Sequence, residues 1–225
     1  MISGETRLVG LLGDPVSQSL SPLMQNAAFA ARGLDWAYVP LLVTGEQLDD
    51  AVRGLVALGF AGANVTTPHK LAVAKLVETS ASSVNTLDVR GEKVLGFSTD
   101  ASILRELEFQ RAAIVGHGGA AVAFAEALPD AARFSRRESW PPDVADIDLV
   151  IHATSERDEV LVELKQGQTL IDLPYPPTAT ARAAEVVGAR VIDGLEVLVA
   201  QGAAAFELWT GVPAPLDVMR AAIRP

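Results

Sequence analysis

The residues best suited to chemistry lie in the segment from Asn64 to Lys70, which reads Asn-Val-Thr-Thr-Pro-His-Lys. Phe60 to Val65 is typical of a short buried strand, and Thr67 and Pro68 are the predicted N-cap and first residue of a helix. Lys70 would then lie in the first helical turn, where free backbone N–H groups and the helix dipole already favour anions. Since a cation there is unfavourable to the dipole, Lys70 indicates an anionic or proton-exchanging ligand.

A pair of serines follows an earlier strand. The apolar run Leu8–Leu12 ends in a tight turn, and Ser19 and Ser21 precede Pro22, the expected first residue of the next helix. Two hydroxyls at a helix N-terminus can hold one carboxylate. Ser21 could equally serve only as a helix cap, and both interpretations stay open.

A glycine-rich turn predicts a nucleotide site. The expected strand Ala112–Val115 runs directly into Gly116, Gly118 and Gly119, with Ala121 at the third small position of the dinucleotide fingerprint. Glycines let the backbone approach a pyrophosphate, and the start of the following helix faces its charge. His117 within the turn could contact a phosphate or simply face solvent.

The next strand indicates which dinucleotide would bind. It ends in Ser135, Arg136 and Arg137, where an acidic residue would favour NAD and an arginine accommodates the 2′-phosphate of NADP. Two arginines in an acidic protein therefore favour NADP. The alternative is that they are ordinary solvated surface charges.

The apolar pattern predicts the elements that must position these groups. Strands are expected at residues 8–12, 36–41, 61–65, 112–115, 132–135, 149–153, 169–172 and 190–192, with a hairpin of 84–89 and 93–97. Helices are expected at 22–32, 46–58, 68–77, 101–107, 119–128, 194–208 and 215–223. Short strands alternating with helices are typical of an α/β fold with largely parallel sheets.

Composition narrows the classes of partner. The net charge of −10 argues against nucleic acid or an anionic membrane. There are no cysteines, and three scattered histidines show no ligand spacing, so no metal site is expected. The N-terminal residues lack a signal-peptide pattern and no stretch is apolar enough to span a bilayer, so we expect a cytoplasmic protein.

Taken in order, these motifs resemble the shikimate dehydrogenase family, the NADP-dependent enzymes of the aromatic amino acid pathway. The resemblance covers nearly the whole chain. It rests on Ser19-x-Ser21-Pro22, Asn64-Val65-Thr66-x-Pro68-x-Lys70, Asn85-Thr86, Thr99-Asp100, the glycine turn, Asp172-x-x-Tyr175 and Gly194-Leu195-x-x-Leu198-x-x-Gln201.

The resemblance implies reversible reduction of 3-dehydroshikimate to shikimate, with Lys70 and Asp100 as the proton-handling pair. Which of the two accepts the proton stays open, and Asp100 could also cap the helix after it. The implied substrate-binding residues are Ser19, Ser21, Thr66, Asn85, Tyr175 and Gln201. The implied cofactor-binding residues are Gly116, His117, Gly118, Gly119, Ala120, Ser135, Arg136, Arg137, Thr154 and Gly194.

The resemblance also implies a two-domain α/β fold. Residues 1–100 would form the substrate-binding and catalytic domain, joined by the returning helices of 197–225. Residues 101–196 would form a Rossmann-like NADP-binding domain, with ligands bound between the two. The expected partners are small molecules, and the chain would be a monomer or homodimer.

Departures from the family pattern leave two alternatives. Gln18 and Gln25 stand where histidines are usual, and the chain is shorter than usual members. Residues 155–159 (Ser-Glu-Arg-Asp-Glu) replace a Pro-x-Gly-Met loop that the family places near the nicotinamide. The chain could therefore be a related dehydrogenase for quinate or aminoshikimate that uses NAD, or a catalytically weak shikimate-binding protein.

Overall fold

The computed structural model describes residues 2–224, which divide into two compact units. The chain up to Asp100 and the chain from Val199 onward form the first, and Ala101–Leu198 forms the second. Both units are built from a sheet with helices, so the predicted α/β class is confirmed.

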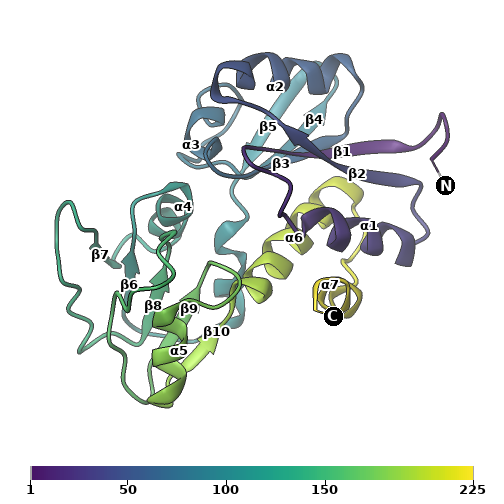
Figure 1. Cartoon of the computed structure of the whole chain (residues 1–225). Coiled ribbons are helices and arrows are strands. Elements are labelled where there is room, and N and C mark those ends of the chain that lie inside the picture. Colours follow the sequence, from purple (N-terminus) through teal and green to yellow (C-terminus); the bar gives the residue numbers. More distant parts are fainter. Residues whose placement is uncertain (1, 225) are drawn as a thin grey trace. The chain divides into compact units, whose positions relative to one another are not determined.

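The first unit contains a mixed five-stranded sheet (Figure 1). Its strands in chain order are β1 (Arg7–Gly13), β2 (Trp36–Leu42), β3 (Gly62–Val65), β4 (Thr86–Arg90) and β5 (Lys93–Phe97). The spatial order is β2-β1-β3-β4-β5, with β1 parallel to β2 and β3, and the pairs β3–β4 and β4–β5 antiparallel. Arg90 pairs with Lys93 across a two-residue turn, in which Gly91 takes a φ of +63° that a hairpin of this length favours in glycine.

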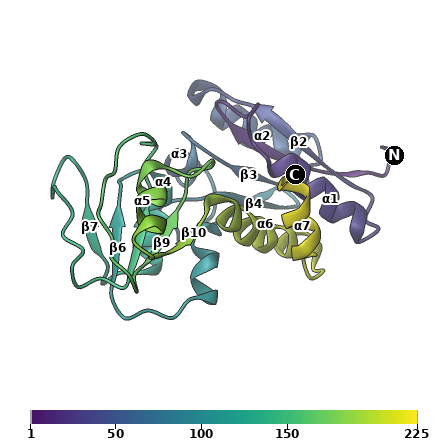
Figure 2. The ribbon, with the colours of Figure 1, turned by 60° about the horizontal axis from the view of Figure 1, so that its bottom comes forward.

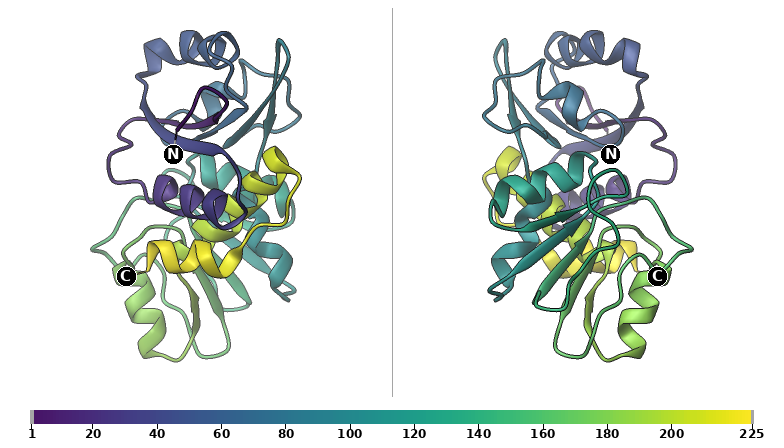
Figure 3. Two further views of the ribbon diagram at one scale, coloured as in Figure 1. Left: turned by 90° about the vertical axis from the view of Figure 1, so that its right-hand side faces the viewer. Right: turned by 90° about the vertical axis from the view of Figure 1, so that its left-hand side faces the viewer.

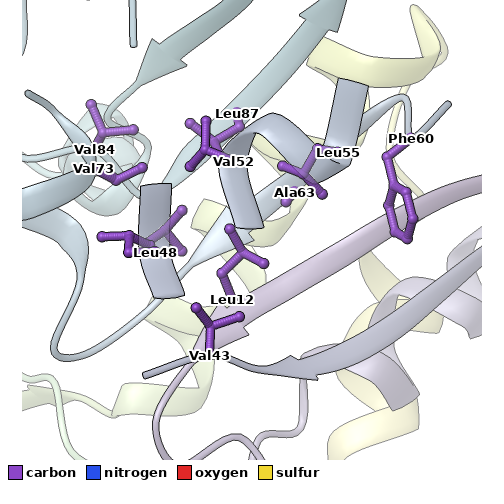
Figure 4. Packing of buried hydrophobic residues seen from close by; sticks show 11 residues of the cluster. Leu12, Val43, Leu48, Val52, Leu55, Phe60, Ala63, Val73, Val84 and Leu87 are labelled. Atoms are coloured by element: carbon purple, nitrogen blue, oxygen red, sulfur yellow. The ribbon is translucent and has the colours of Figure 1, made fainter. Parts of the chain in front are cut away.

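One face of this sheet is covered by the helix α2 (Leu48–Ala57), which follows a short 3-10 turn, η1 (Gly45–Gln47). Its apolar positions Leu48, Val52 and Leu55 pack in one cluster with sheet residues such as Leu12 and Leu87 (Figure 4). The three-to-four residue spacing of these positions is the reason that the segment forms an amphipathic helix on a sheet.

The other face carries α1 (Ser21–Ala31), the greater part of α6 (Gly194–Thr210) and α7 (Leu216–Ile223). Phe29 of α1 stacks on Phe206 of α6 with ring centroids 5.3 Å apart, and α1 and α7 pack side by side (Figure 3). Trp209 of α6 donates its indole N–H to the carbonyl of Leu87 at 2.8 Å. These contacts fix the C-terminal helices on the N-terminal sheet.

The second unit contains a parallel sheet of five strands (Figure 2). The strands are β6 (Ala112–Val115), β7 (Ala132–Phe134), β8 (Leu149–His152), β9 (Thr169–Asp172) and β10 (Arg190–Ile192), in the spatial order β10-β9-β8-β6-β7. The helices α4 (Gly119–Ala127) and α5 (Ala179–Val186) connect them. The short β6, β8 and β9 are almost entirely buried, as expected for parallel strands covered on both faces.

Three local expectations need correction. The helix predicted at 68–77 is only α3 (Lys70–Val73), and its N-cap is His69 and not Thr67. A hydrogen-bonded turn from Thr66 to His69 takes up the residues before it, with the His69 N–H on the Thr66 carbonyl at 3.0 Å. The helix predicted at 101–107 is a 3-10 helix, η2 (Asp100–Glu106).

The helix α5 was not expected. Thr178 is its N-cap and accepts a hydrogen bond from the N–H of Ala181. A threonine followed by an alanine-rich run is the signal that could have predicted it.

Candidate functional site

In the first unit, β1 lies between β2 and β3 in the sheet. The chain therefore leaves β1 on one side and returns to the other, which creates a topological switch point at the carboxyl ends of β1 and β3. Ser19 and Ser21 follow the first of these ends, and Thr66 and Lys70 follow the second. Ligands of open α/β sheets bind at such a point, so the fold places these predicted residues at one edge of the sheet.

The two loops are held together at this edge. The Asp14 N–H donates to the Thr67 carbonyl at 3.2 Å, and the Thr66 N–H donates to the Leu12 carbonyl at 2.9 Å. A Cβ atom at Gly13 would come within 2.3 Å of the Thr66 side chain. Glycine at position 13 therefore allows the loop after β3 to approach the end of β1.

Lys70 and Asp100 form the centre of the candidate site. The Lys70 Nζ atom donates to both carboxylate oxygens of Asp100, at 2.8 and 2.7 Å. The side chains are 15% and 10% exposed, so solvent reaches the pair but does not surround it. The structure thus joins a charged donor and a carboxylate that are 30 residues apart in the sequence.

Backbone contacts fix the position of Lys70. Its carbonyl accepts from the N–H of Val84 at 3.0 Å, which ties α3 to the segment before β4. The preceding His69 is 2% exposed, and its Nε2 lies 2.6 Å from the carbonyl of Val43 in the loop after β2.

Asn85 organises the polar groups around Asp100. Its Nδ2 donates to Asp100 Oδ1 at 2.9 Å and to Thr99 Oγ1 at 3.0 Å, and it lies 3.3 Å from Gln201 Oε1. Its Oδ1 accepts from the Thr99 N–H at 2.7 Å. Asn85 is 2% exposed, so a substrate would have to share or replace one of these Nδ2 contacts.

Residues that the sequence interpretation did not assign extend this network. The Asn64 Nδ2 donates to Thr86 Oγ1 at 3.0 Å, and the Asn64 Oδ1 accepts from the Tyr38 hydroxyl at 2.9 Å. Thr86 Oγ1 lies 3.2 Å from Thr99 Oγ1. Asn64 and Thr86 belong to the motifs around Lys70 and Asn85, which was the available signal, whereas nothing in the sequence pointed to Tyr38.

The side chain of Ser21 does not cap α1. The N-cap of this helix is Leu20, which makes no side-chain cap hydrogen bond, and Ser21 is the first helical residue and is 5% exposed. Ser19 Oγ accepts from the Ser21 N–H at 3.3 Å. The capping explanation for Ser21 is therefore wrong, because Ser21 already lies inside the helix, one position after its N-cap.

In the second unit, the switch point lies at the carboxyl ends of β6 and β8, since β6 is flanked by β7 and β8. Gly116 has a φ of +137°, and a Cβ atom there would lie 2.4 Å from the Ala153 carbonyl. Gly118 is the N-cap of α4 without a side-chain cap hydrogen bond, and a Cβ atom there would meet nothing within 4 Å. The turn therefore leaves open space beside the N–H groups of the first turn of α4, and these groups fit a pyrophosphate. His117 is exposed, and Gly119 and Ala120 begin the helix.

The predicted 2′-phosphate site follows β7. Ser135, Arg136 and Arg137 directly follow the strand, and both arginines are exposed. Arg136 forms an ion pair with Glu159, and its guanidinium lies 5.5 Å from the ring centroid of Trp140. A guanidinium group at this edge fits a phosphate, although Glu159 already binds the guanidinium group of Arg136.

Thr154 belongs to a buried network that sequence analysis missed. The His152 Nδ1 lies 2.6 Å from Asp172 Oδ1, and its Nε2 lies 2.8 Å from Thr154 Oγ1. Asp172 also accepts from the N–H and the hydroxyl of Thr178, at 2.9 and 3.0 Å. His152 and Asp172 are the last residues of β8 and β9, so the sheet itself brings the pair together.

The remaining predicted residues lie in different parts of the chain. Gly194 is buried, and a Cβ atom there would come within 2.4 Å of the Leu173 carbonyl. Tyr175 belongs to the second unit, as does Gly194, whereas Gln201 belongs to the first.

Two negative findings concern residues 2–224. No helix among them combines the length and hydropathy that crossing a membrane requires. The same residues contain no group of three or more histidine, cysteine, aspartate or glutamate side chains arranged to hold a metal ion.

Comparison with known protein families and structures shows which family the chain resembles. Residues 11–88 match the family described as shikimate dehydrogenase substrate binding domain, and residues 194–224 match the shikimate 5′-dehydrogenase C-terminal domain. A similar protein from Anaeromyxobacter dehalogenans strain 2CP-C, named shikimate dehydrogenase (NADP(+)), is 39% identical over 98% of this chain and 97% of its own length. Its counterpart from Methanothermobacter thermautotrophicus, with the same name, is 37% identical over 100% and 98%.

Solved structures agree with this result. The crystal structure of shikimate 5-dehydrogenase from Thermus thermophilus in complex with NADP(H) and shikimate superposes with a TM-score of 0.86. It is 26% identical and the match covers 97% of this chain and 99% of the other. The alignment with the Anaeromyxobacter protein spans 270 positions against 225 residues here, so that protein has internal residues that this chain lacks.

Proposed function

The chain belongs to the shikimate dehydrogenase family, and we propose that Lys70 and Asp100 handle the proton in its reaction. The enzyme catalyses the reversible, NADP-dependent reduction of 3-dehydroshikimate to shikimate. The bidentate hydrogen bonding of Lys70 to Asp100 at the switch point of the first unit is the observation that carries the proposed roles.

The reaction needs a group that exchanges a proton with the substrate oxygen. Oxidation of a secondary alcohol removes a hydride from carbon and a proton from the hydroxyl group, and NADP supplies the hydride acceptor when it is bound. The Lys70 ammonium group has three N–H donors. Two of them bind the carboxylate oxygens of Asp100, with Nζ–O distances of 2.7 and 2.8 Å. A further donor can therefore bind the substrate oxygen while Asp100 compensates the charge of Lys70.

The surrounding residues would orient the substrate. Asn85 donates to Asp100 and lies 3.3 Å from Gln201, and Thr66 follows β3 on the same edge of the sheet as Lys70. We assign Ser19 and Ser21 to the substrate carboxylate, because Ser21 does not cap α1, Ser19 Oγ accepts from the Ser21 N–H and thus lies at the start of the helix, and both hydroxyl groups are suitable donors. The contact of Tyr175 with the substrate stays a prediction.

NADP would bind the second unit. The glycine turn and the start of α4 fit the pyrophosphate, and Arg136 and Arg137 fit the 2′-phosphate. We therefore propose residues 101–196 as the cofactor domain and residues 1–100 with 197–225 as the substrate domain.

The other partner assignments are coarser. The ligands of the related enzymes are small molecules, and the net charge of −10 disfavours nucleic acid. We propose a cytoplasmic monomer or homodimer, and light scattering after size-exclusion chromatography would distinguish the two states.

The test is an absorbance assay with shikimate and NADP. Lys70→Ala is expected to lower kcat by about 10²- to 10⁴-fold, the range for loss of a proton-transfer group. Lys75→Ala removes an exposed lysine near the same short helix and should leave kcat unchanged.

Equal activity of the Lys70→Ala and unmodified enzymes would exclude Lys70 from the chemistry. If the unmodified protein binds shikimate but reduces neither NADP nor NAD, it is a binding protein without catalysis. Turnover of quinate with NAD in preference to shikimate with NADP would identify the related dehydrogenase.

A further inference from the structure

The segment after β8 contains three acidic residues, Glu156, Asp158 and Glu159. The first half of this segment is anchored in the interior of the second unit. Thr154 Oγ1 lies 2.8 Å from His152 Nε2 and accepts from the N–H of Glu156 at 3.1 Å. His152 is in turn held by Asp172 at 2.6 Å. The acidic segment therefore starts from a buried hydrogen-bond network and not from a free loop.

The second half of the segment is anchored on the start of α5. The Arg157 carbonyl accepts from the N–H of Ala179 at 2.7 Å, and the Glu159 carbonyl accepts from the Thr180 hydroxyl at 3.4 Å. The same hydroxyl accepts from the N–H of Leu161 at 3.0 Å. Backbone hydrogen bonds before and after Glu159 thus fix the position of its Cα atom, from which the side chain extends.

From this position the Glu159 carboxylate binds Arg136. The two form an ion pair in which the side chains are 55% and 56% exposed, and Arg136 also lies over Trp140. The Arg137 side chain forms no hydrogen bond or ion pair with any of residues 2–224. The two arginines that could bind a phosphate are therefore not equivalent, because one of them already has an anionic partner.

We propose that Glu159 is a specificity-determining residue for the cofactor, because its carboxylate competes with the 2′-phosphate of NADP for the guanidinium of Arg136. This proposal rests on the proposed function, in which Arg136 and Arg137 take that phosphate. Carboxylate and phosphate both bind the same fork of N–H donors, and two anions at one guanidinium repel each other. NADP must displace Glu159, whereas NAD has no 2′-phosphate and leaves the pair intact.

Two consequences follow for the unmodified enzyme. Its affinity for the 2′-phosphate is lower than two free arginines would provide, and its preference for NADP over NAD is correspondingly reduced. Because the competitor belongs to the segment 155–159, this short acidic segment sets cofactor preference in the chain.

The experiment measures binding and not turnover. Isothermal titration calorimetry compares adenosine 2′,5′-bisphosphate with adenosine 5′-monophosphate, which lacks the 2′-phosphate, on the full-length protein. The variants are Glu159→Gln and the matched control Asp158→Asn, which removes the same charge from the neighbouring residue. Asp158 is exposed, and only its backbone takes part in the hydrogen bonds of the segment.

Glu159→Gln is expected to raise the affinity for the bisphosphate about two- to fivefold, the range that release of an exposed ion pair allows. The affinity for the monophosphate should not change, and Asp158→Asn should have a smaller effect on the bisphosphate. In an Arg136→Ala background, Glu159→Gln should bring no gain, since the competition is then absent.

Other outcomes overturn the proposal in distinguishable ways. An equal gain for Asp158→Asn would mean a general charge effect, and a loss of affinity in Glu159→Gln would mean that Glu159 orients Arg136 for the phosphate. If the unmodified protein binds neither the bisphosphate nor NADP, the proposed cofactor site fails as well.

Discussion

The Lys70–Asp100 pair illustrates how partial burial makes two common residues useful. Both side chains are mostly buried, so neither charge is well hydrated. Each charge is stabilised by its contact with the other. The carboxylate also accepts from Asn85, which leaves it fixed while Lys70 keeps a donor for a substrate. The pair is therefore both a structural contact and the proposed proton-transfer group, and these two roles can be separated by mutation.

Asp100→Asn should lower kcat by at least about 10²-fold and the free energy of unfolding by about 2 kcal/mol, because Lys70 is left as an uncompensated, mostly buried charge. The double variant Lys70→Met with Asp100→Asn removes both charges and should recover part of this stability while staying inactive. Urea unfolding and the absorbance assay measure the two properties. If Asp100→Asn keeps full kcat, Asp100 only holds Lys70 in place.

The hydrogen-bond partners of Asn85 could not be predicted from its sequence motif. Its motif indicated a substrate contact, yet its amide is engaged on both sides by Thr99, Asp100 and Gln201. The sequence could not indicate this, since Gln201 is 116 positions away and reaches Asn85 only because α6 returns to the first unit.

At the scale of elements, glycines set how closely neighbours approach. In β3, a Cβ atom at Gly62 would lie 2.3 Å from the Leu87 carbonyl and 2.5 Å from Trp209 Nε1. In α6, a Cβ atom at Gly202 would lie 2.2 Å from Met24 Cε, the end of a flexible side chain. The first neighbour is rigid backbone and the second can move, so the two positions should tolerate alanine differently.

Gly62→Ala should therefore lower the free energy of unfolding by about 1–3 kcal/mol, the range for overpacking in a core. It should also break the hydrogen bond from Trp209 to Leu87, which a change in tryptophan fluorescence would report. Gly202→Ala serves as the comparison and should cost less, because Met24 can adopt another rotamer. Equal losses would mean that Trp209 and β4 move as easily as Met24.

The acidic segment also titrates in a defined way. Hydrogen bonds from the backbone N–H groups of Asp158 and Arg157 hold the pKa of the Glu156 carboxyl below its ordinary value. A depressed pKa in the folded state means that the carboxylate stabilises the turn above the ordinary glutamate pKa, and that this contribution is lost as the pH falls through the lowered pKa.

In an NMR titration, the amide signals of Arg157 and Asp158 should shift together with a midpoint below that of an ordinary glutamate. Glu156→Gln should abolish this titration while the remainder of the spectrum is preserved. A midpoint at or above the ordinary value would show that these hydrogen bonds do not stabilise the charged form.

On the scale of the whole molecule, the two units should respond to different ligands. Shikimate at ten times its Kd should raise the free energy of unfolding by about 1.4 kcal/mol and slow hydrogen exchange at residues 64–70 and 85–100. Adenosine 2′,5′-bisphosphate should slow exchange at 116–120 and 135–137. Hydrogen exchange with mass spectrometry on the full chain tests both, and protection by the bisphosphate at 64–70 instead would contradict the division of roles.

The sequence by itself determined the class of fold, the order of most elements and the motifs of the site, because apolar periodicity, glycine turns and helix-start residues act over a few neighbouring positions. It failed where local signals compete, as at α3, where the turn from Thr66 to His69 delays the helix to Lys70. Only the tertiary structure decided which polar groups meet. The pairs Lys70–Asp100, His152–Asp172 and Arg136–Glu159 join residues 20 to 30 positions apart, and strand pairing, not spacing along the chain, sets such distances.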